Sequence, residues 1–302
     1  MRIEETRQWS TASSEGVGLP RGVLKATEPV EGVFAHARLA PPASLASWVQ
    51  HFWMVEWDTR NSVPRLQETL PHPSVYLVFE QNLEHADSTM KAEIAGVTTG
   101  KFSKLLEGHS RAFGVKFRAG GFRSLLGAAA STITDCVLPA EQVFGSLVLE
   151  LADRLSRCAD VETMVEATGA FLGSLELLRD TSAQLSAELV ELIFKDPAIL
   201  TVDQLAEKAG MSVRSLQRLF KEYVGVPPKW VIRRYRLHEL VERLHSGQAF
   251  DGAQLALDLG YADQAHLIHD FRHLVGYTPT GYRKLSMTAP LNPPKGDRRK
   301  AV

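Results

Sequence analysis

Between about residues 30 and 120 the apolar positions occur in short runs that alternate with polar positions and are separated by turn-forming residues. Runs of this length and spacing are typical of β-strands. We predict strands in the segments VFAHARLA, VQHFWMVEW, SVYLVFE, AEIAGVTT, FSKLLEG and AFGVKFR. Many short strands with little helix favour a small barrel or sandwich. Residues 1 to about 30 lack such a pattern, and we expect them to form a loose arm.

A helical pattern starts at about Phe122, and two apolar stripes follow at helical intervals. One stripe is Val143, Leu147, Leu151 and Leu155, and the other is Met164, Phe171, Leu175 and Leu178. They predict paired helices, which either pack in the core of their own domain or form a dimer or interdomain face. The pattern changes again at LLRDTSAQ, so we place a domain boundary near residue 180.

The segment TVDQLAEKAGMSVRSLQRLFKEYVG predicts two helices joined by a tight turn. Thr201 and Ser212 are N-cap residues for the two helices, and Gly210 suits the left-handed residue that ends the first. The inward positions are Val202, Leu205, Ala206 and Ala209, then Val213, Leu216, Leu219 and Phe220. The other face of the second helix carries Arg214, Ser215, Gln217, Arg218 and Lys221. This layout is typical of a helix-turn-helix whose second helix enters the major groove of DNA.

The segment AQLALDLGYADQAHLIHDFRHLVGYTP repeats the layout. Gly260 ends one helix and Asp263 caps the next. Leu255, Ala256 and Leu259, then Leu267, Phe271, Leu274 and Val275, are the inward positions. The positions left outside or at the margins are Gln264, His266, Ile268, His269 and Arg272.

Three histidines, His266, His269 and His273, share one face of this last helix because their spacing is helical. The same spacing fits a metal site or a DNA-reading surface. Since the buried positions fix the rotation of the helix, the first two histidines are directed towards the groove side. We therefore favour DNA contact over a metal site.

Between the two units, PPKWVIRRYRLHELVERLHSG predicts a linker helix. A helix of about 19 residues is roughly 28 Å long, which is close to the ~34 Å turn of B-DNA. Arg233, Arg234 and Arg236 on this helix either contact phosphate or belong to a solvated face. From Thr181 onward the chain carries 17 Lys and Arg against 13 Asp and Glu, a net charge of +4, whereas the rest carries −5. This asymmetry favours a polyanion as the partner of the C-terminal part.

Residues 182–286 resemble the DNA-binding domain of AraC/XylS-family transcription regulators. The resemblance is carried by the doubled helix-turn-helix and by SLQRLFK, GYADQAHLIHDFR and GYTPTGYR. It implies a sequence-specific regulator of transcription that binds double-stranded DNA, with RNA polymerase as a further partner to consider. The groove-facing positions that it implies are Arg214, Gln217 and Arg218 in the first unit and Gln264, His266, Ile268 and His269 in the second.

Arginine pairs with guanine and glutamine with adenine through two hydrogen bonds each. His269 stands where relatives often have arginine, and a neutral imidazole donates a single hydrogen bond. We therefore expect a weaker or more shape-dependent readout at the second half-site. The full set of predicted DNA-binding residues is Ser212, Arg214, Ser215, Gln217, Arg218, Lys221, Arg233, Arg234, Asp263, Gln264, His266, Ile268, His269 and Arg272.

The upstream segments LPHPSVYLVFE and GVKFRAGGF are similar to a barrel-like sensory domain found in one branch of that family. The resemblance implies control by a small-molecule effector. Candidate ligand-binding residues are the aromatic Trp48, Trp53, Trp57 and Tyr76 and the polar His51, His72 and Arg118. Each of them is alternatively a core residue. Phe52 and Met54 must face opposite to Trp53 and Trp57 in a strand, so only one set can line the interior.

Enzymatic and metal-binding interpretations fit the sequence less well. A cupin metal site needs a His-x-His pair, but His36, His51, His72 and His85 occur singly. Cys136, in TDCVLP, lacks the setting of a DNA-repair methyltransferase nucleophile, and GxSxG, P-loop and GxGxxG motifs are absent from the sequence. We predict neither enzymatic activity nor a cofactor. An enzymatic or metal-dependent N-terminal module that the DNA-binding part merely localises remains the alternative.

Composition sets the compartment that we expect. The chain is 44% hydrophobic and 23% charged, as in soluble globular proteins, and has no apolar run of the roughly 18 residues that a membrane helix needs. The N-terminus lacks an apolar signal region, and two cysteines are too few for a disulfide framework. We expect a cytoplasmic, nucleoid-associated protein with reduced thiols and no membrane partner. Whether Cys136 or Cys158 senses redox state stays open.

Together these patterns predict an α+β protein. Residues 1–180 are expected to form a regulatory domain, with a barrel-like (cupin-like) β-rich core at about 30–120 and helices at about 122–178 that offer a homodimer interface. Residues 181–286 are expected to form the all-α DNA-binding domain, and residues 287–302 a disordered basic tail.

Overall fold

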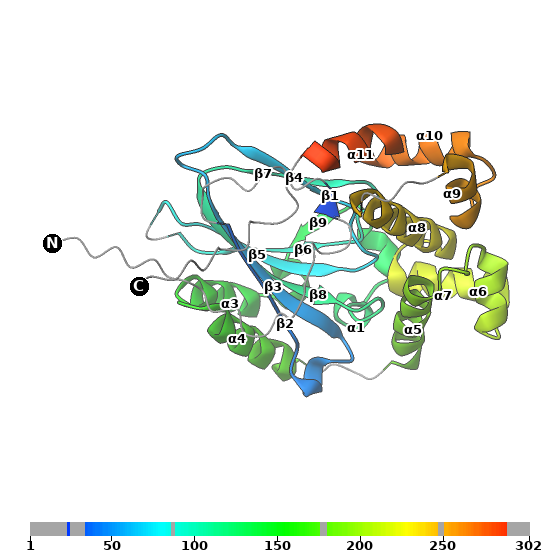
Figure 1. Ribbon diagram of the computed structural model, residues 1–302. Helices are drawn as coiled ribbons and strands as arrows, with labels where there is room; N and C mark the ends of the chain where they lie inside the picture. The colour runs from blue at the N-terminus through cyan, green and yellow to red at the C-terminus, as the bar shows by residue number, and fades with distance from the viewer. Residues whose placement is uncertain (1–22, 25–33, 86–87, 176–179, 247–250, 289–302) are drawn as a thin grey trace, which may run out of the picture.

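The computed structural model describes residues 23–24, 34–85, 88–175, 180–246 and 251–288, as a β-rich part followed by a helical part (Figure 1). The predicted α+β architecture is confirmed. Most of the predicted N-terminal arm and the predicted tail beyond residue 288 lie outside the described residues.

The larger sheet is antiparallel and has six strands. Their order is β2 (Phe34–Leu39), β3 (Val49–Asp58), β8 (His109–Phe117), β5 (Tyr76–Asn82), β6 (Lys91–Ala95) and β9 (Val137–Pro139). The first five coincide with predicted strands, because their alternating residues mark one face for burial. The short β9 was not predicted.

A second sheet consists of β1 (Val23–Leu24), β4 (Arg65–Thr69) and β7 (Phe102–Leu106). The segment FSKLLEG was predicted as a strand and contains β7, whereas β4 was not predicted. Its sequence, RLQET, has a single apolar residue and so shows no alternation, and that residue, Leu66, is 53% exposed. Leu106 of β7 packs on Trp57 and Ala112 of the larger sheet. The small sheet therefore covers part of one face of the large one.

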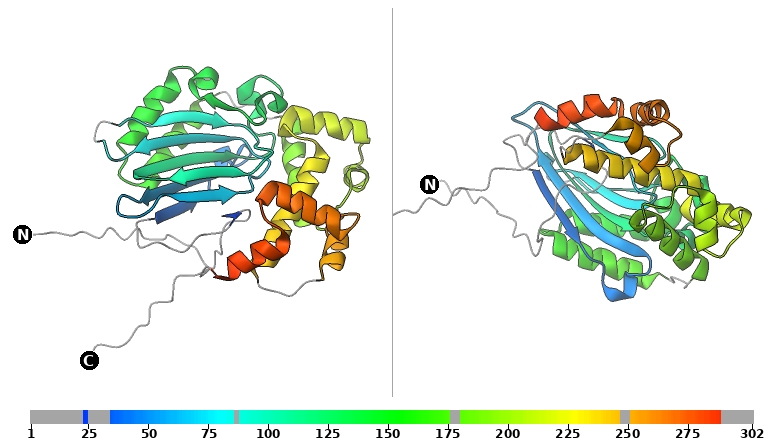
Figure 2. Two further views of the ribbon diagram at one scale, coloured as in Figure 1. Left: turned by 90° about the horizontal axis from the view of Figure 1, so that it is seen from above. Right: turned by 45° about the vertical axis from the view of Figure 1, so that its right-hand side comes forward.

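The opposite face of the six-stranded sheet carries the main core. Phe52 pairs with Val115 and Met54 with Phe113, and all four side chains are buried. Helices α2 (Glu141–Phe144), α3 (Leu147–Ser156) and α4 (Val161–Ser174) contribute to this core, and α3 and α4 lie along the sheet in Figures 1 and 2. The expectation that Phe52 and Met54 face away from Trp53 and Trp57 is confirmed.

One predicted stripe is partly wrong. Leu147 was expected to point inward with Leu151 and Leu155, yet it is 53% exposed, and its neighbour Val148 is fully buried instead. The physical reason is that the segment forms two helices rather than one. Gly145 ends α2 with φ of +64°, so the helical phase starts again in α3.

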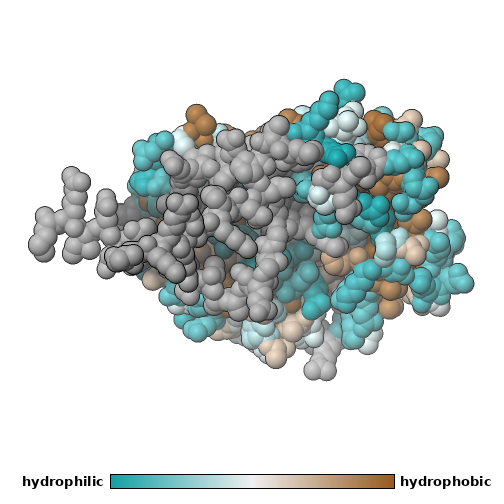
Figure 3. Space-filling model, viewed as in Figure 1, coloured by the Kyte–Doolittle hydropathy of each residue, from teal (hydrophilic) through white to brown (hydrophobic). Residues whose placement is uncertain are grey.

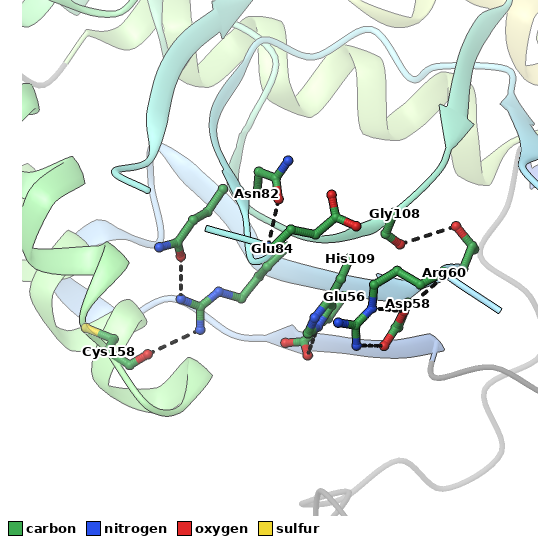
Figure 4. A network of polar contacts seen from close by, with 11 residues as sticks. Glu56, Asp58, Arg60, Asn82, Glu84, Gly108, His109 and Cys158 are labelled. Carbon is green, nitrogen blue, oxygen red and sulfur yellow. Dashed lines mark hydrogen bonds and ion pairs between the residues drawn. The ribbon is translucent and has the colours of Figure 1, made fainter. Parts of the chain in front are cut away.

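A polar network fixes one end of the six-stranded sheet (Figure 4). Arg111, which is 7% exposed, donates to Gln81 Oε1 at 2.8 Å and to the carbonyl of Cys158 just after α3 at 3.2 Å. Glu56 lies 3.4 Å from His109 in the same network. These contacts tie strand ends to a helix end, and we assign them a structural role.

The helical part holds two small cores that share one long helix. Its elements are α5 (Thr181–Lys195), α6 (Val202–Lys208), α7 (Val213–Leu219), the π-helical turn η3 (Phe220–Val224), α8 (Pro228–His245), α9 (Gly252–Asp258), α10 (Gln264–Val275) and α11 (Pro279–Thr288). Helix α8 gives Val231 to the first core and Leu240 and Leu244 to the second. Among the described helices, none is both long and apolar enough to cross a membrane.

Candidate nucleic-acid interface

The first helix-turn-helix forms as its sequence predicts. Thr201 and Gln204 make a capping box, in which Thr201 Oγ1 accepts from the Gln204 amide and Gln204 Oε1 accepts from the Thr201 amide. Gly210 has φ of +60°, and Ser212 caps α7 by accepting from the Ser215 amide at 3.2 Å. Because Leu216 is fully buried, the opposite side of α7 faces solvent. That side carries the exposed Arg214, Gln217 and Arg218, with the half-buried Ser215 beside them, and the exposed Lys221 follows in η3.

The second unit has the same geometry. Gly260 has φ of +76°, and the Asp263 carboxylate caps α10 by accepting from the His266 amide at 2.7 Å. Leu267 and Phe271 are buried. The exposed side chains of α10 include Gln264, His266, His269, Arg272 and His273, and Ile268 is half-buried. On the side of the molecule shown in Figure 3, hydrophilic and hydrophobic areas are interspersed over these helices.

The first unit is attached to the β-rich part next to its exposed helix. The Gly225 amide donates to the Phe220 carbonyl at 2.8 Å, which closes the π-helical turn η3 after α7. Thr134 Oγ1 donates to the Gly225 carbonyl at 2.7 Å, and Arg123 pairs with Glu222 at 2.6 Å. The position of α7 is thus coupled to the β-rich part over a single helical turn.

Two of the linker arginines are not on the surface. Arg234 is 1% exposed, donates to the carbonyls of Thr99 and Gly100, and lies 4.5 Å from the ring of Trp230. Arg236 is 3% exposed and donates to the Ile193 carbonyl at 2.9 Å. The expectation that these two residues contact phosphate is wrong for this arrangement, because other parts of the chain cover them.

Burial of the Arg234 guanidinium disfavours its charged form. Burial lowers its pKa to about 10, although Asp135 and Asp270 oppose the shift. A charged group is kept inside a protein only where other groups hydrogen-bond to it. Here the acceptors are backbone carbonyls of the β-rich part, so Arg234 is an interdomain anchor.

The remaining predicted phosphate contact, Arg233, is partly exposed but already engaged. Its side chain is 43% exposed and pairs with Asp270 of α10 at 2.5 Å. Asp270 also accepts from the Tyr261 hydroxyl at 2.7 Å. This triad, which fixes α10 on the linker helix, was not predicted. A signal was present, because Asp270 lies three residues after the buried Leu267 and therefore on the inward side of the helix.

The linker helix also contacts the β-rich part through histidines. His238 Nε2 donates to the Leu70 carbonyl at 2.9 Å, and its ring meets the ring of His72 with centroids 4.7 Å apart. Leu24 and Leu70 join the core of the second unit. His72, a predicted ligand-binding residue, therefore lies at the interface with α8.

The other predicted ligand residues separate into two groups. His51, Trp53, Trp57 and Tyr76 share the face of the six-stranded sheet that lies opposite the main core. We call this the aromatic face. Arg118 instead donates to the Ala46 carbonyl at 2.7 Å, and its amide bonds to the Trp48 carbonyl at 2.8 Å. These contacts fix the loop before β3, so the structure does not bring Trp48 and Arg118 into one site with the others.

Within the aromatic face, Trp57 lies apart from His51 and Tyr76. Its Nε1 donates to the Glu107 carbonyl at 3.1 Å beside a cavity of about 440 Å³. Glu80 and Lys104 pair across the rim of that cavity at 2.7 Å.

Sequence reasoning missed two basic residues of the aromatic face. Lys116 on β8 is the cross-strand partner of His51, and Arg38 on β2 is the cross-strand partner of Trp53, so both lie on this face. The signal was alternation in GVKFR, where Lys116 falls between Val115 and Phe117. In the part of the chain that the structure describes, no group of three His, Cys, Asp or Glu residues is placed to hold a metal ion.

Two family models match this chain. Residues 37–139 match a domain of unknown function (DUF6597), and residues 205–285 match the helix-turn-helix domain. An uncharacterized HTH-type transcriptional regulator of Haemophilus influenzae is 30% identical over 112 residues, 37% of each chain. A protein of Streptomyces antibioticus with the provisional name AraC-like transcription regulator is 32% identical over 102 residues, 33% of each chain. The matched segments span less than half the length of these relatives.

Among solved structures, an AraC-type transcriptional regulator from Chromobacterium violaceum is 27% identical with a TM-score of 0.32, and the match covers 35% of this chain and 95% of that one.

The fold and the site together define a β-rich protein with a doubled helix-turn-helix domain at its C-terminal side. More particularly, the matched helix-turn-helix segment is similar to that of a protein named as an AraC-like transcription regulator.

Proposed function

We propose that this protein is a sequence-specific, DNA-binding regulator of transcription. The observation that supports the proposal most is the pair of exposed helices α7 and α10. Each helix follows a glycine with positive φ, begins at a side-chain cap and turns a buried leucine inward. Each would enter a major groove, and the two grooves would belong to one face of a site of about 20 base pairs.

The contacts divide by chemistry. Exposed arginine and lysine side chains would position the protein on phosphates, whereas Gln217 and Arg218 of α7 would read base edges. On α10 the reading residues would be Gln264, His266 and His269, helped by Ile268. Ser212 and Asp263 would act mainly as caps, since their side chains bond to backbone amides.

The test is a comparison of Gln217→Ala with Gln184→Ala, an exposed glutamine on α5 that bonds to Glu188. Genomic footprinting first supplies the cognate site. Gln217→Ala should cost about 1–3 kcal/mol there, about 5- to 150-fold in Kd, and relax the preference at one base pair. The Gln184 variant should bind as the wild type does. Equal weakening on random DNA would show that Gln217 reads no base.

Salt supplies a second test of the same surface. Cation release from phosphates makes the logarithm of the binding constant fall steeply with the logarithm of salt concentration. A flat salt titration would exclude this surface as a DNA contact.

We further propose that the β-rich part controls DNA binding in response to a small molecule, with the domain division near residue 180. Support comes from the contacts of Thr134, Arg234 and His238, which join the β-rich part to the first helix-turn-helix unit and to the linker helix. We propose that the protein forms a homodimer through α3 and α4. We also propose that it contacts RNA polymerase and that it is cytoplasmic and nucleoid-associated. The exposed Leu147 and Leu149 of α3 support the dimer.

A further inference from the structure

A buried lysine lies in the middle of the aromatic face. Lys116 is 5% exposed and sits on β8, the strand between β3 and β5. Its Cα partners are His51 on β3 and Tyr76 on β5, so the three side chains stand in one row on one face. The next row along the strands holds Arg38, Trp53, Gly114, Val78 and Glu93.

Within the described part of the chain, no acidic side chain pairs with the Lys116 ammonium. Among the described residues it makes no hydrogen bond and no ion pair within the distances that define these contacts. The two carboxylates on the same face are engaged elsewhere, Glu93 with Lys91 at 2.5 Å and Glu80 with Lys104 at 2.7 Å. A buried charge without a partner is costly, so a structural role alone does not account for a lysine here.

The surrounding basic groups and burial oppose protonation of the cluster, which an anion would favour. Burial, followed by the charge of Arg38, lowers the pKa of Lys116 to about 7. Burial and the charges of Lys116, Arg38 and His36 lower the pKa of His51 to about 3. Tyr76 is the remaining titratable group in the row, and burial raises its pKa, so its hydroxyl stays a donor.

An aromatic wall stands beside these donors. The Trp53 indole lies against Gly114, where an added Cβ would come within 2.4 Å of the ring, so only glycine leaves room for it. Trp53 Nε1 is buried and has no hydrogen-bond partner among the described residues. The cluster thus offers N–H and O–H donors with an apolar ring surface next to them.

We propose that Lys116, His51, Arg38 and the Trp53 indole N–H bind the anionic group of a small aromatic molecule, with Trp53 and Tyr76 against its ring. The inference rests on the proposed sensory function of the β-rich part and names the class of effector as an aromatic carboxylate or sulfonate. An anion supplies the acceptor oxygens that these donors lack. Two residues after the end of β8, Ala119 is buried in the core of the first helix-turn-helix unit, so the site lies close to the part that it would control.

The test uses two probes of nearly equal shape. One is 8-anilino-1-naphthalenesulfonate, an aromatic anion, and the other is N-phenyl-1-naphthylamine, which lacks the sulfonate. Binding is measured by probe fluorescence and by quenching of tryptophan on the full chain without DNA. At about pH 6 the wild type should bind the anion about tenfold more tightly than the neutral probe, as expected for one charge-assisted contact.

The variants separate the charge from the shape of the site. Lys116→Met should lose this advantage while its affinity for the neutral probe stays within about twofold. Raising the pH to about 8.5 should remove the advantage in the wild type, because Lys116 loses its proton, but not in Lys116→Arg, whose guanidinium stays charged. Lys195→Met, on a lysine of α5 whose side chain is 69% exposed, is the control and should match the wild type.

Two results would overturn the proposal. The first is an anion advantage that survives in Lys116→Met, and the second is an equal loss for both probes in a variant that unfolds at the wild-type temperature. Should Lys116→Met fail to fold, the pH dependence of the wild type against Lys116→Arg still decides. A protein that binds the anion through Lys116 but shows no sequence-specific DNA binding would refute the regulator function and leave the site intact.

Discussion

The triad of Tyr261, Asp270 and Arg233 should determine how firmly helix α10 is held against α8. Asp270→Ala removes an acceptor that serves two donors, the Tyr261 hydroxyl at 2.7 Å and the Arg233 guanidinium at 2.5 Å. Tyr261 is only 6% exposed, so its hydroxyl would be left without a partner away from water. Because Asp270 is on α10 and Arg233 is on α8, loss of this carboxylate removes a direct link between the two helices.

The magnitude follows from the two contacts. A hydrogen bond to a charged group contributes about 1.5–3 kcal/mol, and leaving a buried donor unpaired adds to the loss. The Arg233 side chain is 43% exposed, so solvent screening limits its ion pair to about 0–1 kcal/mol. We expect Asp270→Ala to cost about 2–4 kcal/mol and Arg233→Met less than about 1 kcal/mol.

Native-state amide hydrogen exchange is the assay, because it reports the opening free energy of α10 within the intact chain. Tyr261→Phe combined with Asp270→Ala completes a double-mutant cycle, in which the coupling should be about 1–2 kcal/mol. Asp258→Ala is the control, since that carboxylate is 41% exposed and lies 3.6 Å from Arg243. An opening free energy of α10 that changes by less than about 0.5 kcal/mol in Asp270→Ala would refute the reasoning.

Three further predictions concern other parts of the chain. Burial lowers the pKa of His51 to about 3. Below about pH 6.5 this histidine is therefore protonated in the unfolded chain but still neutral in the folded chain, so the free energy of unfolding decreases as the pH falls from about 6.5 towards 3. His51→Gln should therefore lose less stability between pH 7.5 and pH 5 in urea unfolding, and parallel curves would count against this. Arg234→Met should lower interdomain stability by about 2–3 kcal/mol, seen as faster hydrogen exchange in α8, because two carbonyls of the β-rich part lose their donor; unchanged exchange would contradict it. Gly225→Ala should lower the unfolding temperature more than Gly210→Ala, because both have positive φ but only the former would press a Cβ to 3.0 Å from Thr134 Oγ1; equal losses would show that backbone strain alone matters.

The helix-turn-helix units could be predicted from sequence because every signal in them is local. Thr201, Ser212 and Asp263 cap helices through amides three residues away, and Gly210 and Gly260 take positive φ within their own turns. Caps, turns and inward leucines all lie within one helical pair, so short-range chemistry determined them. The main strands follow for a similar reason, since alternation marks the buried face of each.

Contacts between distant segments were decided only by the tertiary structure. On the sequence Arg233, Arg234 and Arg236 are equivalent basic residues of one helix, yet one is exposed and two are buried. What separates them is the loop at Thr99 and the carbonyl of Ile193, which are 135 and 43 residues away. The surroundings of Lys116 were decided in the same way, because strand register places it beside His51 and Tyr76. The sequence by itself determined the local geometry of the exposed helices α7 and α10. Tertiary packing decided which charged side chains are buried, because burial depends on segments that no local pattern encodes.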